Sequence, residues 1–238
     1  VNSADYQDVE VFAVAFLRAL RTGKRFLFRS AAAVTRVLGG VPERPLLTRA
    51  ELVPQENRNG GVVLIGSHVN KTTQQMEELR SCRYPIAFIQ FDQHLVLQPG
   101  GLEGEVKRVV ALAQDKIRAG QSVAVYTRRD RFDLPTGDPD KQLEVSVRIS
   151  DAVTSIIGLL EVRPNFIIAK GGITSSDVGT KALRVHRAEV MGQIKPGIPV
   201  WMTGPESKFP GMPYVIFPGN VGERETLREV VELLMGDA

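Results

Sequence analysis

Two patterns of apolar residues alternate along residues 62–238. Short runs rich in aliphatic and aromatic side chains occupy residues 62–65, 85–89, 122–126 and 165–169. Such runs lack the polar alternation of a half-exposed strand, so they predict strands buried on both faces of a parallel sheet. Between them, apolar residues recur at helical spacing, as in Val106, Val109, Val110, Ala113 and Ile117, and a long helix is expected over residues 141–160. This alternation predicts a three-layer α/β/α domain.

The residue pattern changes in the last third of the chain. Residues 185–217 carry glycines and prolines between short β-type runs, which predicts further strands and a mixed, largely parallel sheet. Two helices are expected beside them, one near residues 178–183 and one at the end of the chain. The terminal helix has Leu227, Val230, Val231 and Leu234 on one face.

The first 61 residues read as a separate region. Residues 8–20 have the spacing of an amphipathic helix that ends near Gly23, and residues 25–28 are a strand candidate. The stretch up to residue 61 is rich in Pro, Glu, Arg and Asn and ends in two glycines. We interpret residues 48–61 as a linker and residues 62–238 as one domain.

A glycine turn follows the strand at residues 165–169. The segment Ala169–Asp177 joins that strand to a helix through Gly171 and Gly172, with hydroxyl residues Thr174, Ser175 and Ser176 next. Glycine lets backbone amides approach a phosphate, and the free amides of a helix start favour an anion. An ordinary tight turn with a helix cap explains the same residues. The Gly-Lys-Ser or Gly-Lys-Thr ending of a Walker A loop is absent.

A second glycine turn, at residues 217–222, also lies between a predicted strand and a predicted helix. In open α/β sheets, ligands bind beyond the carboxyl ends of the strands, so Ser67, Gly172 and Gly219 are expected to line one crevice. Near the first of these, Thr72 and Gln75 have the spacing of a capping box for a helix through Leu79.

Composition excludes several classes of function. The chain has 30 Lys and Arg against 27 Asp and Glu, without a basic stripe interleaved with aromatic residues, so no nucleic-acid partner is expected. One cysteine and three scattered histidines cannot build a disulfide framework or a common zinc site. No apolar run approaches the roughly 20 residues of a membrane span. We therefore expect a cytoplasmic protein with neither a membrane partner nor a metal bound by its own residues.

Charged residues near the turns allow two interpretations. Arg128, Arg129 and Arg131 have acidic neighbours, which favours a solvated loop over a phosphate site. Lys170 and Asp177 suit a phosphate ligand and a magnesium ligand respectively, but structural roles are favoured for both.

Three segments together resemble the four-carbon acid sugar kinase family. The first is Gly66-Ser67-His68 with Thr72, Thr73 and Gln75, and the second is Lys170 to Val178. The third comprises Pro196 to Trp201, Gly204 to Ser207, Phe209 to Gly211, Pro213-Tyr214 and Pro218 to Gly222. They extend over the chain from Val62 onward, and their combination is specific.

The resemblance implies ATP-dependent phosphorylation, with Mg²⁺, of threonate, erythronate or 3-oxo-tetronate. It implies nucleotide contacts from Ser67, from the turn Gly171-Gly172-Ile173-Thr174 and from Gly219. ATP, ADP and a small sugar acid are thus the expected partners, and the oligomeric state is left open. One departure is Arg128, where the family pattern has serine after Thr127.

An amino-terminal motif of the family is missing. Members open with an Asp-Asp-x-Thr-Gly-Ala type motif in a substrate domain, and residues 1–47 resemble only the last helix and strand of that domain, a second α/β domain. The resemblance therefore places the catalytic base elsewhere, and no catalytic residue is assigned. The alternatives are a non-catalytic nucleotide-binding regulatory module and a sugar-phosphate isomerase-like domain.

Overall fold

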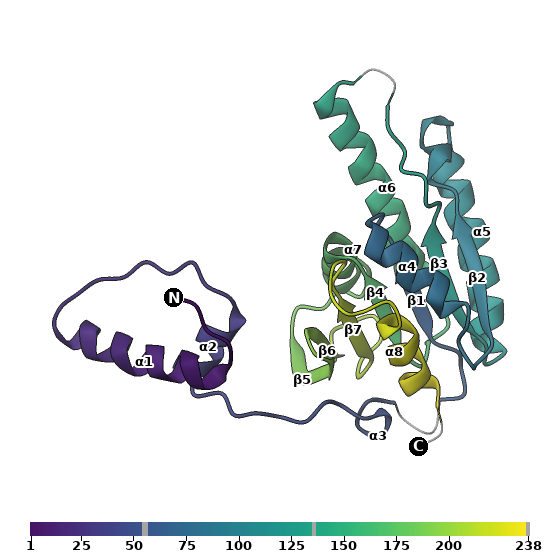
Figure 1. Ribbon diagram of the computed structural model, residues 1–238. Helices are drawn as coiled ribbons and strands as arrows, with labels where there is room; N and C mark the ends of the chain where they lie inside the picture. The colour runs from purple at the N-terminus through teal and green to yellow at the C-terminus, as the bar shows by residue number, and fades with distance from the viewer. Residues whose placement is uncertain (54–56, 135–136, 237–238) are drawn as a thin grey trace. The chain divides into compact units, whose positions relative to one another are not determined.

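The computed structural model describes residues 1–53, 57–134 and 137–236. The chain divides into two compact units, residues 1–45 and 46–238 (Figure 1). Part of the expected linker, residues 54–56, lies outside the described residues. The rest includes the short helix α3 (Arg49–Leu52), whose Leu52 is buried in the core of the second unit together with Leu47.

The first unit contains helices α1 (Tyr6–Arg21) and α2 (Ala32–Leu38). The strand expected at residues 25–28 is not formed. A strand needs a partner for its backbone hydrogen bonds, and this unit offers none. Phe26 and Phe28 instead place their rings against Phe16 of α1, with centroid distances of 5.2 and 4.8 Å.

The second unit is built on a seven-stranded sheet with the order β2-β3-β1-β4-β7-β6-β5. The strands are β1 (Val62–Ile65), β2 (Ile86–Phe91), β3 (Ser122–Thr127), β4 (Ile167–Lys170), β5 (Ala188–Lys195), β6 (Ile198–Thr203) and β7 (Pro213–Phe217). The first four pair in parallel, and β7 is parallel to β4. Strands β5 and β6 are antiparallel to their neighbours. The mixed, mostly parallel sheet expected from the sequence is confirmed.

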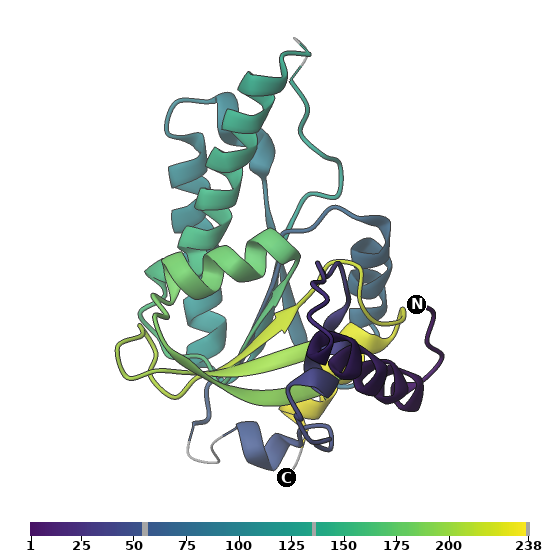
Figure 2. The same ribbon diagram turned by 90° about the vertical axis from the view of Figure 1, so that its left-hand side faces the viewer.

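Helices cover both faces of this sheet (Figure 2). One face packs against α5 (Gly101–Arg118), α6 (Pro139–Leu159) and α7 (Gly172–Asp177), which continues into the π-helical turn η2 (Val178–Ala182). The other face packs against α4 (Asn70–Leu79) and α8 (Thr226–Met235). A short 3-10 helix, η1 (Gln93–Leu97), follows β2. In β1, Val62 and Leu64 enter one core and Val63 and Ile65 the other, which explains its uninterrupted apolar run.

The chain reverses its direction of travel across the sheet at β1. From β1 it passes to β2 at one edge, returns through β3, and then crosses to β4 on the other side of β1. The carboxyl ends of β1 and β4 therefore flank the point where ligands bind in sheets of this kind. None of the helices in the described ranges is long and apolar enough to cross a membrane.

Tyr214 of β7 links the sheet to α7. It is fully buried, and its hydroxyl donates to the carbonyl of Ser175. Burial raises the pKa of this hydroxyl, so it remains a donor across the working pH range. The bond fixes the start of α7 over the sheet.

Tyr214→Phe should lower the free energy of unfolding by about 0.5 to 1.5 kcal/mol, the net value of one neutral hydrogen bond. Denaturant titration measures this change. Tyr126→Phe is the matched control, because the Tyr126 hydroxyl makes no hydrogen bond within the described part of the chain. Equal stability of the two variants would show that the Tyr214 bond contributes nothing to the fold.

Candidate functional site

Three turns meet beyond the carboxyl ends of β1, β4 and β7. The amide of Gly66 donates to the Lys170 carbonyl at 3.3 Å, and the amide of Gly171 donates to the Phe217 carbonyl at 2.9 Å. A Cβ atom on Gly219 would lie 3.3 Å from Ser67 Oγ and 3.9 Å from Gly171 Cα. Ser67 therefore sits between the other two turns.

Two of these glycines cannot be replaced without moving the turns. A Cβ atom on Gly66 would overlap Thr174 Oγ1, and one on Gly171 would lie 3.2 Å from both Ser67 Cβ and Thr174 Oγ1. Gly171 also has φ of +129°, which side chains of L-residues rarely adopt. Gly172 differs, because a Cβ atom there would meet nothing within 4 Å.

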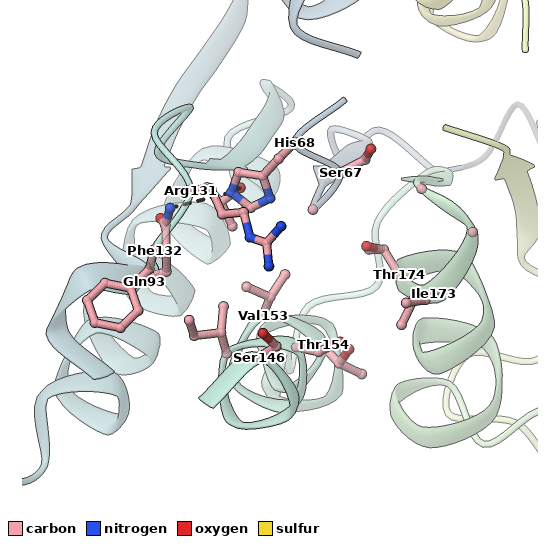
Figure 3. Close-up of a pocket in the computed structure, with 16 residues that line it drawn as sticks. Ser67, His68, Gln93, Arg131, Phe132, Ser146, Val153, Thr154, Ile173 and Thr174 are labelled. Carbon is pink, nitrogen blue, oxygen red and sulfur yellow. Dashed lines mark hydrogen bonds between the residues drawn. The ribbon is translucent and has the colours of Figure 1, made fainter. Parts of the chain in front are cut away.

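A cavity of about 330 Å³ opens on the α6 side of these turns (Figure 3). Its lining comes from the turns after β1 and β4, from residues 93, 127, 131 and 132, and from one face of α6. The lining residues are Gly66, Ser67, His68, Gln93, Thr127, Arg131, Phe132, Ser146, Ile149, Ser150, Val153, Thr154, Gly171, Gly172, Ile173 and Thr174. Five of the six residues expected to bind nucleotide line this cavity. Gly219 does not line it and lies behind Ser67.

The backbone of the turns presents free donors. The amides of Gly172, Ile173 and Thr174 make no hydrogen bond within the described residues, and α7 has no side-chain cap. Neither Thr174 nor Ser175 caps this helix, since Gly171 is the N-cap and Ser175 Oγ donates to its carbonyl at 2.7 Å. The uncapped amides are the groups that suit an anion.

A positively charged side chain, Arg131, lines the cavity, and its Nε lies 3.0 Å from the Asp133 carboxylate. Arg131 is the only formally charged side chain among the described lining residues, and its guanidinium points into the space between His68 and Val153 (Figure 3). Burial lowers the pKa of His68, and the positive charges of Arg129 and Arg131 lower it further. The imidazole is therefore neutral at pH 7, and it lies 3.3 Å from Thr127 Oγ1.

The three arginines after β3 have different surroundings. Arg128 forms ion pairs with Asp92 and Asp130, as expected of a solvated loop. Arg129 departs from that expectation, because its Nη2 donates to the Ser67 carbonyl at 2.7 Å and to Thr73 Oγ1 at 2.9 Å. Burial lowers the pKa of Arg129. Its guanidinium thus supports the Ser67 turn from behind.

Side chains from α4 hold the turn after β7 by its carbonyl groups. Thr72 Oγ1 donates to the Gly219 carbonyl at 3.1 Å. Gln75 Nε2 donates to the carbonyls of Val221 at 3.1 Å and Glu223 at 2.7 Å. The capping box expected from Thr72 and Gln75 is therefore wrong, because α4 begins earlier, at Asn70. Both side chains are fully buried, and their spacing of three residues places them on one face of α4.

Lys170 also holds the turn after β7, and we call Thr72, Gln75 and Lys170 together the clamp. Its side chain is 0% exposed, and its Nζ donates to the carbonyls of Pro218 at 2.7 Å and Gly219 at 3.3 Å. Nζ also lies 4.0 Å from the centre of the Phe217 ring. Burial, with a smaller contribution from Lys71, lowers the pKa of Lys170 to about 7. These contacts favour the structural interpretation of Lys170 over that of a phosphate ligand.

Asp177 has a structural role as well. Its carboxylate accepts from Lys181 Nζ at 3.2 Å and from Ser150 Oγ at 3.4 Å. Among the described residues, no group of three or more His, Cys, Asp or Glu side chains is arranged to hold a metal ion. The donors around the cavity are amides and hydroxyls, which suit phosphate oxygens, and the described chain supplies no cage for a metal.

The comparisons with known proteins agree with this architecture. Residues 62–227 match the model of a family described as the nucleotide-binding C-terminal domain. No curated protein matches the chain.

Two solved structures share the fold. One is a protein from Salmonella typhimurium LT2 described as a candidate tRNA synthase, with a TM-score of 0.60 and 18% identity over 96% of this chain and 51% of that one. The other is a domain of unknown function from Bordetella bronchiseptica, a domain-swapped dimer with bound citrate, with a TM-score of 0.56 and 16% identity over 98% of this chain and 52% of that one. The chain spans about half the length of these structures.

The lowered pKa of Lys170 predicts how the free energy of unfolding depends on pH. Between pH 7 and the ordinary lysine value of 10.5, Lys170 is neutral in the folded chain and protonated in the unfolded chain. The unfolded state then binds more protons, so this group makes stability rise with pH across that window and leaves it unchanged below pH 7.

Lys170→Met removes this dependence. The free energy of unfolding of the wild type minus that of Lys170→Met should therefore increase from pH 7 to pH 10, as measured by denaturant titration at each pH. Lys107→Met, at an exposed position on α5, controls for loss of a lysine side chain. A difference that stays constant with pH would contradict the assignment.

Proposed function

The chain belongs to the family of nucleotide-binding C-terminal domains, and from that premise we propose that it is the nucleotide-binding half of an ATP-dependent kinase acting on a four-carbon sugar acid. The observation that carries the proposal is the convergence of three glycine turns around Ser67 at the switch point of the sheet. The motifs from Gly66 to Gly222 support threonate, erythronate or 3-oxo-tetronate as the acceptor. A cytoplasmic location belongs to the same proposal.

The phosphates bind at the turns after β1 and β4. The free amides of Gly172, Ile173 and Thr174 donate to phosphate oxygens, and Ser67 adds a hydroxyl. Gly219 acts through its lack of a side chain, since its close approach to Ser67 keeps that turn in place. Arg131 adds a positive charge on the opposite side of the cavity.

Mg²⁺ accompanies ATP in this proposal. When bound, the ion neutralises charge on the phosphates, and magnesium in such sites is held by few carboxylates together with substrate phosphates. On the phosphate side of the cavity, Ser67 and Thr174 would offer the ion their hydroxyl oxygens. No carboxylate of this chain is assigned to it.

The cavity orients the nucleotide in this proposal, and none of its residues is assigned as the catalytic base. Its described lining residues include no Asp or Glu, the residue types that accept the acceptor proton in kinases. The acceptor pocket and the base therefore belong to another domain of the complete protein. Residues 1–47 form the closing part of that substrate domain in this proposal, which the division of the chain after Pro45 supports.

ADP should raise the melting temperature of the chain, because a ligand of the folded state stabilises it by mass action. Gly172→Val should fold normally, since the position is open, and should weaken ADP binding at least 10-fold by filling the phosphate space. A thermal-shift measurement gives the first effect, and calorimetric titration of ADP gives the second. Gly104→Val, at an equally open position on α5, should bind ADP as the wild type does. Equal affinity of the two variants would remove the turn from the site.

Residues 1–238 should bind nucleotide without phosphorylating a sugar acid. Phosphoryl transfer requires the acceptor oxygen to be held in line with the γ-phosphate, and half a cleft cannot hold it. Incubation with ATP, Mg²⁺ and a panel of threonates and erythronates should give no phosphorylated acid with residues 1–238, whereas the complete protein should give one. Turnover by residues 1–238 would place the acceptor site within this chain. Nucleotide binding without turnover by the complete protein would favour the regulatory module.

A further inference from the structure

A buried lysine without an acidic partner lies beside the glycine turns. Lys170 is 0% exposed, and among the described residues it forms no ion pair with a carboxylate. Its Nζ donates to the carbonyls of Pro218 and Gly219, at 2.7 and 3.3 Å. A buried cation is normally paired with an anion, because the loss of its hydration is otherwise unfavourable. Lys170 therefore lacks a counter-charge that the described part of the chain does not supply.

The neighbours of Lys170 on the strands and on α4 add no negative charge. Ile65 of β1 and Phe217 of β7 are in register with Lys170, and neither side chain titrates. Lys71 of α4 is itself a cation, and so is Arg129, which holds the turn after β1. Burial, and then the charge of Lys71, lower the pKa of Lys170 to about 7. Without a bound anion, these surroundings favour the neutral amine.

The acidic residues of the surrounding elements are engaged elsewhere. Glu223 and Glu225, between β7 and α8, are exposed. Those on α4, α7 and α8 pair with basic side chains: Glu77 with Arg80, Glu78 with Arg224 and Arg228, Asp177 with Lys181, Glu229 with Lys195, and Glu232 with Arg228. None of them acts on the pKa of Lys170. A bound anion would thus bring the negative charge that Lys170 lacks.

Lys170 is joined to both groups of unpaired amides at the site. Its backbone runs into Gly171 and the amides of residues 172–174, and its side chain holds Pro218 and Gly219, where the unpaired amides of residues 219–222 begin. A phosphate bound to either group brings its charge close to the buried Nζ. At an effective dielectric constant of about 20, an opposite charge about 8 Å away raises the pKa of an ammonium group by about one unit or more.

We propose that anion binding at the turns after β4 and β7 is coupled to protonation of Lys170, so that the site takes up a phosphate group together with a proton from solvent. This inference rests on the proposed nucleotide-binding function and adds its regulation by pH. The proton binds the free electron pair of Nζ, and the ammonium then donates charge-assisted hydrogen bonds to Pro218 and Gly219. Lys170 is therefore a positioning residue that acts through the turn.

The coupling fixes the sign of the pH dependence. Below pH 7, Lys170 is already protonated in the free chain, so this group leaves anion affinity unchanged. Above pH 7 the bound state holds more protons than the free state, so affinity falls as pH rises, until the bound lysine also loses its proton. For a rise in pKa of about one unit, ADP affinity should fall about 3- to 10-fold from pH 7 to pH 9.

Calorimetric titration of ADP and of sulfate tests the coupling. Sulfate is included because its charge is constant over this pH range. At pH 8, titrations in Tris and in EPPS, which differ in ionisation enthalpy, should show uptake of about half a proton per anion by the wild type. Lys170→Met should show neither this uptake nor the fall in affinity. Lys170→Gln, which keeps a neutral donor for the two carbonyls, should likewise bind with an affinity that does not change with pH.

Lys107→Met is the matched control, because Lys107 is an exposed lysine on α5, and it should keep both effects. Wild-type affinity for both anions that is equal at pH 7 and pH 9, or proton uptake that persists in both Lys170 variants, would overturn the coupling. Proton-coupled binding of sulfate without binding of ADP would overturn the proposed function and leave the coupling in place. Binding of neither anion would overturn both.

Discussion

The close approach of the turns after β1, β4 and β7 is the constraint on which the rest of the site depends. Gly66 faces Thr174 without room for a Cβ atom, and Gly171 adopts a backbone conformation reserved for glycine. This spacing leaves Ser67 between the other two turns, beside the first residues of α7 that line the cavity. A side chain at Gly66 would overlap Thr174, and one at Gly171 would crowd Ser67 and Thr174, at the switch point of the sheet where the ligand is expected.

Much of the fold could be predicted from the sequence, because strands that are buried on both faces of a sheet consist of uninterrupted apolar runs. The run Val62 to Ile65 is apolar since its residues enter two cores alternately. The strand expected at residues 25–28 shows the limit of this argument. Its apolar residues are real, but strand formation depends on a pairing partner, and these side chains pack on α1 instead.

The backbone turns of the site could be predicted from the sequence, whereas the partners of several side chains could not. Glycines between a strand and a helix identify turns, and parallel strands bring those turns together, so five of the six expected residues line one cavity. The partners of Thr72, Gln75 and Arg129 depend on contacts across more than 50 residues of sequence, which local spacing cannot reveal. The nucleotide contacts of these turns remain a prediction.

Two basic residues beside the turns, Lys170 and Arg129, bind the protein's own backbone. Lys170 and Arg129 are residue types that commonly bind phosphate, yet each donates to backbone carbonyls, of Pro218, Gly219 and Ser67. A hydrogen bond to a backbone carbonyl oxygen fixes the orientation of that peptide group. In the turn after β7, moreover, the amides of Gly219 to Gly222 make no hydrogen bond within the described residues. These buried side chains therefore fix peptide groups in place beside the cavity, and Arg131, which is ion-paired with Asp133, is the charged side chain among the described lining residues. Fixed backbone amides discriminate by position, so this arrangement favours geometric selection of a phosphate chain over simple attraction of negative charge.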